Sequence, residues 1–338
     1  MSKDLKALLV SFKDATSYWV TNLTSDKISR IKAAKVADPL DELLKLVKLI
    51  KAHVTKVGII FNPETLAKQE HTAYTTLEKL SETLILLVSV VSQLQANYIS
   101  KLFYNAIVCQ ATQLIESNHE LANELAYIYE VKEDSARLVS VGKIWSNCDS
   151  LTALISNGAL SLLTSEIKQS IGLIDDGFDE FVEWTENPVD MDDDPFGFSD
   201  DDEEEGEEEE VKSEEDAGKL ASEDAEYEEN TAELKTYAEE WIKKIELIKL
   251  LLPSFKKSLP KSTTGSQIDE IDTLQRKISN SIDKLIVDLM MNRTITSQTG
   301  LITKEMSSHS RKLAKLGESI HNNDKKATWY TTWINKFS

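Results

Sequence analysis

The apolar residues of this chain recur at intervals of three and four over long stretches. An α-helix has 3.6 residues per turn, so this spacing places the apolar side chains along one face of each helix. Faces of this kind pack against other helices at the shallow crossing angles of bundles. Two of the clearest stretches are Leu40, Leu43, Val47, Ile50, Val54, Val57, Phe61 and then Leu77, Leu80, Leu84, Leu87, Val91, Leu94, Tyr98.

Proline, asparagine and glycine indicate where these helices begin and end. Asp38 before Pro39 supplies an N-cap and a proline at the first helical position. Asn62-Pro63 ends that helix and begins the next. Further helices are expected over 151–181 with one turn omitted at Gly158 and a stop at Asn187-Pro188, over 234–252 with a stop at Pro253, and over 271–289, 294–321 and 324–337.

No alternation typical of strands competes with this pattern, and glycine (11) and proline (6) are too scarce for a fold rich in hairpins. Each apolar run lasts three or four repeats before a turn, whereas an extended coiled coil sustains its repeat. The sequence therefore predicts an all-α fold of antiparallel helical bundles.

An acidic run interrupts the helices. From Val189 to Glu215, 16 of 27 residues are Asp or Glu and only Lys212 is basic, which accounts for −15 of the chain's net charge of −20. Such a segment repels itself and has almost nothing to bury, so we expect it to be disordered. The predicted organisation is an N-terminal bundle over 1–187, a disordered acidic linker over 188–218, and a helical region over 219–338. That last region either forms its own bundle or completes the first.

The sequence offers no pattern typical of catalysis. None of the five histidines falls in H-E-x-x-H or pairs with another at i, i+4, and no glycine-rich phosphate loop or G-x-S-x-G elbow occurs. The carboxylates of the acidic run are solvated, so they lack the perturbed pKa values that catalytic pairs need. We expect no enzyme activity, no catalytic residues, no cofactor and no metal site.

The composition also indicates the cellular compartment and argues against a membrane span and against nucleic acid as a partner. Cys109 and Cys148 lie in no metal-ligand spacing and are expected as small buried residues of a protein in a reducing compartment. The longest apolar stretch, residues 84–88, is far shorter than the roughly 20 residues of a membrane span. The first residues contain no apolar core followed by a small-residue cleavage site, so we do not expect secretion. The acidic balance argues against direct binding of nucleic acid, which needs Lys and Arg contacts.

The acidic run contains candidate interaction sites. Acidic residues follow Ser199 and Ser213 in the pattern of acidophilic kinases, so both serines are predicted phosphorylation sites. Pro195, Phe196 and Phe198 stand among acidic residues. They are interpreted either as a tether that packs loosely on the bundle or as a linear motif that inserts a phenylalanine into a partner.

Tryptophans are spread over the helical regions, where aromatic residues at helical spacing usually belong to the core. Trp329 and Trp333 lie near the C-terminus, where the fold often covers side chains incompletely. They are therefore the tryptophans predicted to be exposed and available to a partner.

The layout resembles the Grap-and-cyclin-D-interacting (cyclin-D-binding) protein family. The resemblance is carried by Val141-Gly142-Lys143-Ile144-Trp145-Ser146-Asn147-Cys148, by the long helix up to Phe181, by an Asp-Pro-aromatic turn with an acidic insertion, and by residues 268–279. It implies five-helix bundles similar to vinculin, α-catenin and talin modules. It also implies a nuclear and cytoplasmic non-enzymatic regulator that binds D-type cyclins or helix-loop-helix factors and restrains the cell cycle.

The sequence thus favours a helical-bundle interaction protein whose grooves accept a partner helix and whose acidic linker tunes that binding. An acidic chaperone for histones or other basic proteins is the alternative, and its binding would fall steeply with salt. A vinculin-like cytoskeletal adaptor is a third reading, which co-sedimentation with filamentous actin would separate from the first.

Overall fold

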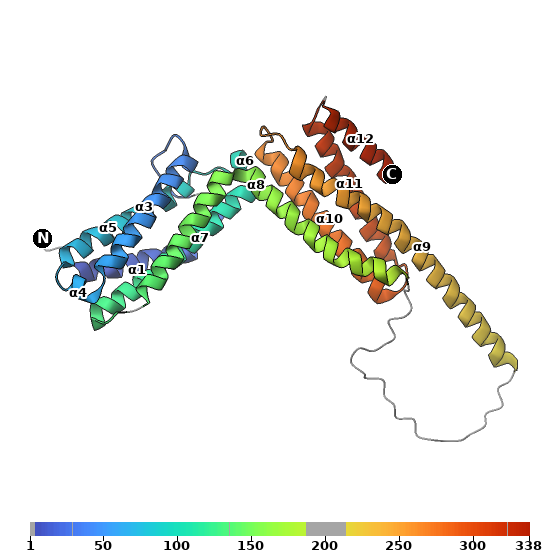
Figure 1. The fold of residues 1–338 in the computed structure, drawn as a ribbon, viewed down its shortest axis with the longest axis horizontal. Helices are drawn as coiled ribbons and strands as arrows, with labels where there is room; N and C mark the ends of the chain where they lie inside the picture. Colours follow the sequence, from blue (N-terminus) through green and yellow to red (C-terminus); the bar gives the residue numbers. More distant parts are fainter. Residues whose placement is uncertain (1–3, 29, 135, 187–213, 323) are drawn as a thin grey trace, which may run out of the picture. The chain divides into compact units, whose positions relative to one another are not determined.

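The computed structural model describes residues 4–28, 30–134, 136–186, 214–322 and 324–338 (Figure 1). Over these ranges the chain forms helices and no strand. The predicted all-α class is therefore confirmed. The helices group into two compact units, the first of residues 1–163 with 264–269 and the second of residues 164–263 with 270–338.

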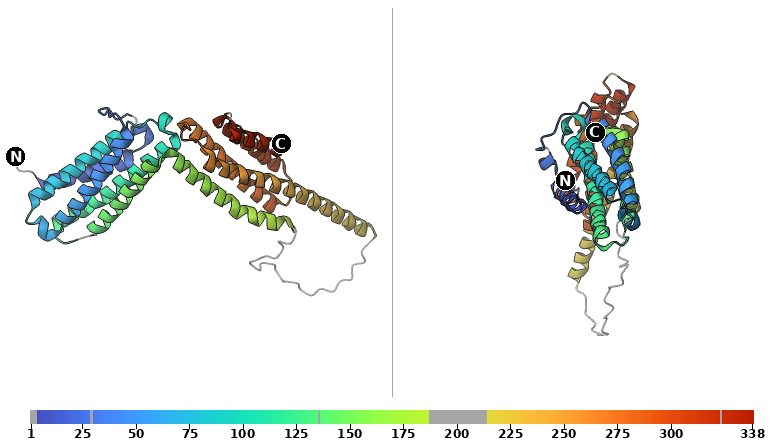
Figure 2. Two further views of the ribbon diagram at one scale, coloured as in Figure 1. Left: turned by 45° about the horizontal axis from the view of Figure 1, so that its top comes forward. Right: turned by 90° about the vertical axis from the view of Figure 1, so that its left-hand side faces the viewer.

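The first unit is built from five long helices within its described residues. They are α1 (Leu5–Asn22), α3 (Pro39–Ile60), α5 (Glu70–Val91), α7 (Lys101–Val131) and the first part of α8 (Arg137–Glu186), joined by the short α2 (Ser25–Ile28), α4 (Pro63–Leu66) and α6 (Ala96–Ile99). Helix α3 packs on α5, and α1 packs on α7 and α5 (Figure 2). Their apolar faces form one continuous core.

The second unit also contains five long helices in its described part. They are the rest of α8, α9 (Glu214–Ser258), most of α10 (Gly265–Asn292), α11 (Ser297–Ile320) and α12 (Lys325–Phe337). Helices α11 and α12 pack on each other and both pack on α9. The core of this unit includes Phe178, Phe181, Trp241, Phe255 and Tyr330.

Helix α8 contributes to both units. Gly158 within it has a φ of 76°, a left-handed conformation that glycine adopts without strain, and the helix is interrupted there as the apolar stripe predicts. Beyond this point Glu166 pairs with Arg276 at 2.5 Å and Asp175 with Lys249 at 2.7 Å. The division therefore falls after residue 163 instead of at residue 187.

The second half of α8 thus supplies a helix to the C-terminal bundle. The helices after the acidic run therefore do not complete the first unit, and they do not form a bundle without α8. Helix α9 begins at Glu214, so residues 214–218 of the predicted linker are helical. The remainder of that linker, residues 188–213, lies outside the described residues.

The predicted boundaries hold where a capping residue defines them. The carboxylate of Asp38 accepts hydrogen bonds from the backbone N–H groups of Leu40 and Asp41, both at 3.1 Å, and α8 ends at Glu186.

Two predicted helix boundaries are wrong. Helix α9 continues through Pro253 to Ser258, because Leu251, Leu252 and Phe255 are buried and their burial offsets the roughly 3 kcal/mol cost of an interior proline.

Helix α5 ends at Val91 instead of continuing its stripe to Tyr98, which is 80% exposed. The side chain of Gln93 causes the chain to turn there by bonding the segment that precedes α3. Its Oε1 accepts from the backbone N–H of Val36 and its Nε2 donates to the carbonyl oxygen of Ala34, both at 2.9 Å.

Residues 264–269 belong to the first unit because Asp269 caps one of its helices. The carboxylate accepts hydrogen bonds from the backbone N–H groups of Lys101 at 2.8 Å and Leu102 at 3.0 Å, at the start of α7. These are among the four N–H groups that a helix N-terminus leaves without an internal partner. A residue distant in sequence thus provides the cap.

Candidate partner-binding surface

Helices α3 and α8 lie antiparallel along a seam on the surface of the first unit. Near the start of α8, Arg137 donates from Nε to the carbonyl oxygen of Gly58 at 3.0 Å. Two turns farther along α8, the indole Nε1 of Trp145 donates to the hydroxyl oxygen of Thr55 at 3.1 Å. The order of these contacts fixes which face of α8 turns toward α3.

The seam ends at an ion pair. Lys51 of α3 and Asp149 of α8 approach to 2.5 Å, and both side chains are substantially exposed. An exposed pair of this kind adds at most about 1 kcal/mol. The ion pair therefore contributes little stability, but it marks the point on the seam where apolar side chains end and charged side chains begin.

Apolar side chains remain exposed between these contacts. Leu138 is 59% exposed and Trp145 39%, and Gly142 between them is also exposed. These residues stand at i, i+4 and i+7, which is one face of a helix. Ile59 on α3 is 65% exposed and follows Gly58, whose Cβ position lies 3.8 Å from Leu138. We name Leu138, Gly142, Trp145 and Ile59 the Trp145 strip.

Two features shape the strip for contact. A Cβ at Gly142 would meet nothing within 4 Å, so the missing side chain leaves room between Leu138 and Trp145. The hydrogen bond to Thr55 holds the indole of Trp145 in one orientation. An aromatic side chain that is already oriented loses less conformational entropy when a partner covers it.

The sequence did not single out Trp145 as a surface residue. The available signal was the apolar spacing Leu138-x-x-x-Gly142-x-x-Trp145, which lies on a different side of α8 from the core residues Ile144, Cys148 and Leu151. A helix with apolar residues on both sides is buried on both sides or has a second face available for a partner.

The two tryptophans predicted to be exposed differ in the structure. Trp329 is 40% exposed, as expected. Trp333 is only 3% exposed, so its predicted exposure is wrong. Its indole N–H donates to the carbonyl oxygen of Leu247 at 2.7 Å and its ring stacks on Phe337 with centroids 4.6 Å apart. The reason is that α12 turns this face onto α9, which the end of a chain does not reveal.

The remaining predicted site residues are not described by the structure. Pro195, Phe196, Phe198, Ser199 and Ser213 all lie within the range 187–213, outside the described residues. Their roles as linear motif and as phosphorylation sites stay predictions.

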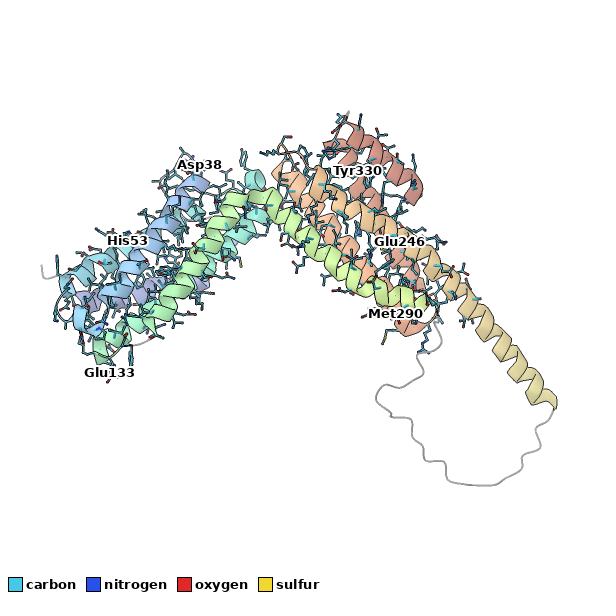
Figure 3. The ribbon with its side chains drawn as sticks, in the orientation of Figure 1. Asp38, His53, Glu133, Glu246, Met290 and Tyr330 are labelled. Carbon is cyan, nitrogen blue, oxygen red and sulfur yellow. The ribbon has the colours of Figure 1, made fainter. Side chains whose placement is uncertain are left out.

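One serine–histidine contact invites comparison with a nucleophile and its base. The Oγ of Ser258 lies 3.0 Å from Nε2 of His321 and 3.1 Å from the hydroxyl of Tyr330. His321 is 6% exposed and Tyr330 1%, and their rings stack with centroids 5.9 Å apart. Because His321 and Tyr330 are buried, these contacts link Ser258 of α9 to Tyr330 of α12 inside the second unit. Tyr330 is labelled in Figure 3.

Elsewhere in the described ranges, no three His, Cys, Asp or Glu side chains gather in a way that could hold a metal ion. Within the same ranges, no helix combines the length and apolar character needed to cross a bilayer.

An all-α chain with an exposed, pre-oriented apolar strip on a bundle has the features of a protein-interaction module. Residues 42–187 match the family model described as Grap2 and cyclin-D-interacting, N-terminal. The chain contains a domain of this family over those residues, which confirms the resemblance drawn from the sequence. All four residues of the Trp145 strip lie inside the matched range.

Two curated proteins are similar to larger parts of the chain. The uncharacterized protein YLR287C of Saccharomyces cerevisiae is 28% identical over 317 residues, which cover 85% of this chain and 82% of the yeast protein. The uncharacterized protein C22E12.18 of Schizosaccharomyces pombe is 23% identical over 211 residues, 62% of this chain and 57% of its own length. Neither name states an activity or a partner.

Proposed function

We propose that this protein is a non-enzymatic regulator that binds a helical partner of the cyclin or helix-loop-helix type and restrains it. The observation that carries the proposal is the Trp145 strip, an exposed apolar surface inside the range that matches a cyclin-D-interacting family. A partner helix recognises such a surface through apolar residues spaced at i, i+3, i+4 and i+7. The regulator acts in the cytoplasm and the nucleus.

Trp145 is the expected centre of the interface. Tryptophans dominate binding energies when they become fully buried, and the loss of one commonly costs 2 kcal/mol or more. Leu138 and Ile59 flank it with exposed apolar surface, while Lys51 and Asp149 provide a polar border. An apolar centre with a polar rim is the usual arrangement of a protein interface.

The acidic run tunes this binding. Phosphorylation of Ser199 and Ser213 would add roughly −1.5 to −2 charges at each site and would further exclude acidic partners. The run also supports a second candidate function, that of an acidic chaperone for histones or other basic proteins, because 16 of the 27 residues from 189 to 215 are acidic.

A binding assay with purified components distinguishes these functions. The full chain would be titrated against a fluorescently labelled D-type cyclin, a helix-loop-helix domain and core histones, each at low and at high salt. Trp145→Ala is expected to weaken cyclin or helix-loop-helix binding at least about thirtyfold, equivalent to 2 kcal/mol, at both salt concentrations.

Trp329→Ala is the matched control, because Trp329 is 40% exposed and Trp145 is 39% exposed. Leu138→Ala is a second test of the strip, and Leu173→Ala is its control because Leu173 is 65% exposed and Leu138 is 59% exposed, both on α8. Equal losses from Trp329→Ala and Trp145→Ala would contradict the assignment of the surface. Binding to histones alone, abolished by salt, would replace the regulator with the chaperone.

A further inference from the structure

A groove of about 620 Å³ lies between α10 and α11, two consecutive helices of the second unit (Figure 1). Ligand sites in proteins commonly have volumes of about 300–1,000 Å³, so the groove is large enough for a small molecule. Its charged side chains are Lys277 and Lys284 of α10 with Lys304 and Glu305 of α11. Three lysines and one glutamate give the lining a net positive charge.

The polar side chains of the groove have donors to spare. Over the described ranges, none of Lys277, Lys284 and Lys304 has a carboxylate within ion-pair distance. Asn280 and Ser308 also line the groove, and their side chains make no hydrogen bond to another described residue. Ammonium, amide and hydroxyl groups all donate hydrogen bonds. The groove therefore suits a ligand that is negatively charged and rich in acceptors.

The lysines stand at two levels along the groove. The carboxylate of Asp288 accepts a hydrogen bond from the hydroxyl of Thr299 at 2.5 Å, near the short loop that joins the two helices as an antiparallel pair. Counted from this contact at 1.5 Å per residue, Lys284 lies about 6 Å along α10 and Lys304 about 7.5 Å along α11. Lys277 lies about 16 Å along α10, which is about 10 Å beyond the other two lysines.

The far level of the groove has a positive potential at His309. By the same counting, this residue lies about 15 Å along α11 from Thr299, at the level of Lys277. Burial, and then the charges of Lys277 and Lys312, lower the pKa of His309. Glu305 acts in the opposite direction. The Nδ1 of His309 is buried and has no hydrogen-bond partner in the described part of the chain.

Phosphate groups suit this lining better than carboxylates. A phosphate monoester carries about −1.5 to −2 charges and three oxygens that accept hydrogen bonds, whereas a carboxylate carries one charge on two oxygens. Lysine commonly binds phosphate as a point charge. A single phosphate group is too small to engage lysines at levels about 10 Å apart. The ligand must therefore carry more than one.

From these charges, donors and spacings, we propose that the groove between α10 and α11 binds a ligand that carries two or more phosphate groups. Lys284 and Lys304 hold the phosphate at one level, and Lys277 beside His309 holds the phosphate at the other. This site lies in the second unit, so it goes beyond the partner binding proposed for the Trp145 strip of the first unit.

Calorimetric titration of the full chain with inorganic tripolyphosphate, in magnesium-free buffer at low salt, tests the site. The flexible lysine side chains can reach both ends of this anion. Monophosphate and hexaglutamate are titrated in parallel, the first because it has one phosphate group and the second because it carries its charge on carboxylates. Tripolyphosphate is expected to bind about tenfold more tightly than either, or better.

The same phosphate chemistry occurs in soluble ligands and in lipid head groups. Vesicles of phosphatidylcholine, with and without phosphatidylinositol bisphosphate, separate the two sources in a flotation assay. Flotation that needs both the bisphosphate lipid and the groove lysines would assign the phosphates to a lipid head group. Tripolyphosphate binding without flotation would assign them to a soluble ligand.

Two triple variants test the lysines. The groove variant combines Lys277→Gln, Lys284→Gln and Lys304→Gln, and it should bind tripolyphosphate about tenfold more weakly or worse. The control removes the same charge from three exposed lysines elsewhere in the second unit, Lys243→Gln, Lys257→Gln and Lys336→Gln. Its affinity should change by less than about twofold, because solvent and salt screen distant charges.

A substitution of opposite sign tests the one acid of the groove. Glu305→Gln removes the carboxylate that repels an anion there, so it should tighten tripolyphosphate binding by about threefold. Glu239→Gln, at an exposed position of α9, removes the same charge outside the groove and should have little effect.

Nuclear magnetic resonance of the histidines locates the bound ligand. Tripolyphosphate in the groove should raise the pKa of His309, because its negative charge offsets the charges of Lys277 and Lys312. The chemical shift of His71, exposed in the first unit, should not respond to the ligand. His309→Gln assigns the resonance.

The natural protein alone can overturn the proposal. It fails if tripolyphosphate does not bind, or if binding leaves the pKa of His309 unchanged. Hexaglutamate affinity equal to that of tripolyphosphate would also overturn it, since the groove would then select charge and not phosphate. Equal losses from the groove and control variants would do the same. Circular dichroism checks that each variant retains the fold.

Discussion

The guanidinium of Arg137 donates from Nε to the carbonyl oxygen of Gly58 across 3.0 Å, and this arginine is only 4% exposed. Its Nη1 donates to a carboxylate oxygen of Asp134, with which it forms an ion pair. Burial lowers the pKa of Arg137. A charged group in this position is held by its hydrogen bonds and also fixes the start of α8 against the end of α3.

Arg137→Met is expected to lower the free energy of unfolding by about 1–3 kcal/mol, because it leaves the buried carbonyl of Gly58 without its donor. Urea unfolding followed by circular dichroism would measure this change. Arg30→Met, at an exposed position, should change stability by no more than about 0.5 kcal/mol. A loss at Arg137 no greater than that of this control would show that the buried contact contributes nothing.

Two glycines of α11 should respond to alanine in opposite directions. A Cβ at Gly317 would lie 2.6 Å from two ring atoms of Tyr330 and 2.9 Å from Phe255, so Gly317→Ala is expected to destabilise the second unit by about 1–3 kcal/mol. A Cβ at Gly300 would meet nothing within 4 Å. Gly300→Ala should therefore stabilise the helix by about 0.5–1 kcal/mol.

Thermal unfolding of both glycine variants, followed at 222 nm, provides the measurement. The contrast depends on the close approach of α12 to α11 at Tyr330. If both substitutions raised the melting temperature, that approach would have to be looser than the structure shows.

The two cysteines should differ in reactivity. Burial raises the pKa of the Cys148 thiol to about 12, and this residue is 1% exposed as predicted, whereas Cys109 is exposed and its predicted burial is wrong. The thiolate is the reactive form, so iodoacetamide at pH 8 should modify Cys109 in the native protein and leave Cys148 unmodified. Peptide mass spectrometry before and after addition of urea would check this, with Cys148 labelled only in urea.

Stability should fall on mild acidification. Burial lowers the pKa of His321, with Lys326 acting in the same direction and Asp324 opposing it. Because the folded pKa lies below the unfolded value of about 6.5, the unfolded state takes up a proton first as the pH falls. Stability is thus complete above pH 6.5 and is lost progressively below it, until the folded pKa is reached.

Urea midpoints between pH 8 and pH 5 would measure this dependence. His321→Gln, which retains a polar partner for Ser258, should flatten the decline, whereas His71→Gln at an exposed position should not. The pKa values of His53 and His309 are also lowered, so part of the decline is expected to remain. An unchanged slope in His321→Gln would contradict the assignment.

Much of the fold follows from the sequence because helix formation is governed by nearby residues. The apolar stripe of 40–61, the cap at Asp38 and the break at Gly158 all appear where the sequence predicts them. The errors occur where distant residues decide the outcome. Pro253 stays inside a helix because its neighbours are buried, and α5 ends early because Gln93 binds the segment before α3.

The residues of the candidate site were harder to predict from the sequence than the helices. The sequence favours a core position for Trp145 and an exposed one for Trp333, yet Trp145 is 39% exposed and Trp333 is 3% exposed. The difference arises because α8 turns Trp145 toward the edge of α3, whereas α12 turns Trp333 onto α9. Local spacing gives the relative orientation of side chains on a helix but not which neighbouring helix covers them.

The sequence by itself therefore determined that this protein is all-helical, where most helices lie, and that its negative charge is concentrated in one segment. Only the tertiary structure decided that α8 serves two compact units and that Trp145 and not Trp333 stands at the surface. The physical reason is that helix periodicity and charge are properties of neighbours in the chain, whereas burial and pairing depend on residues that only folding brings together.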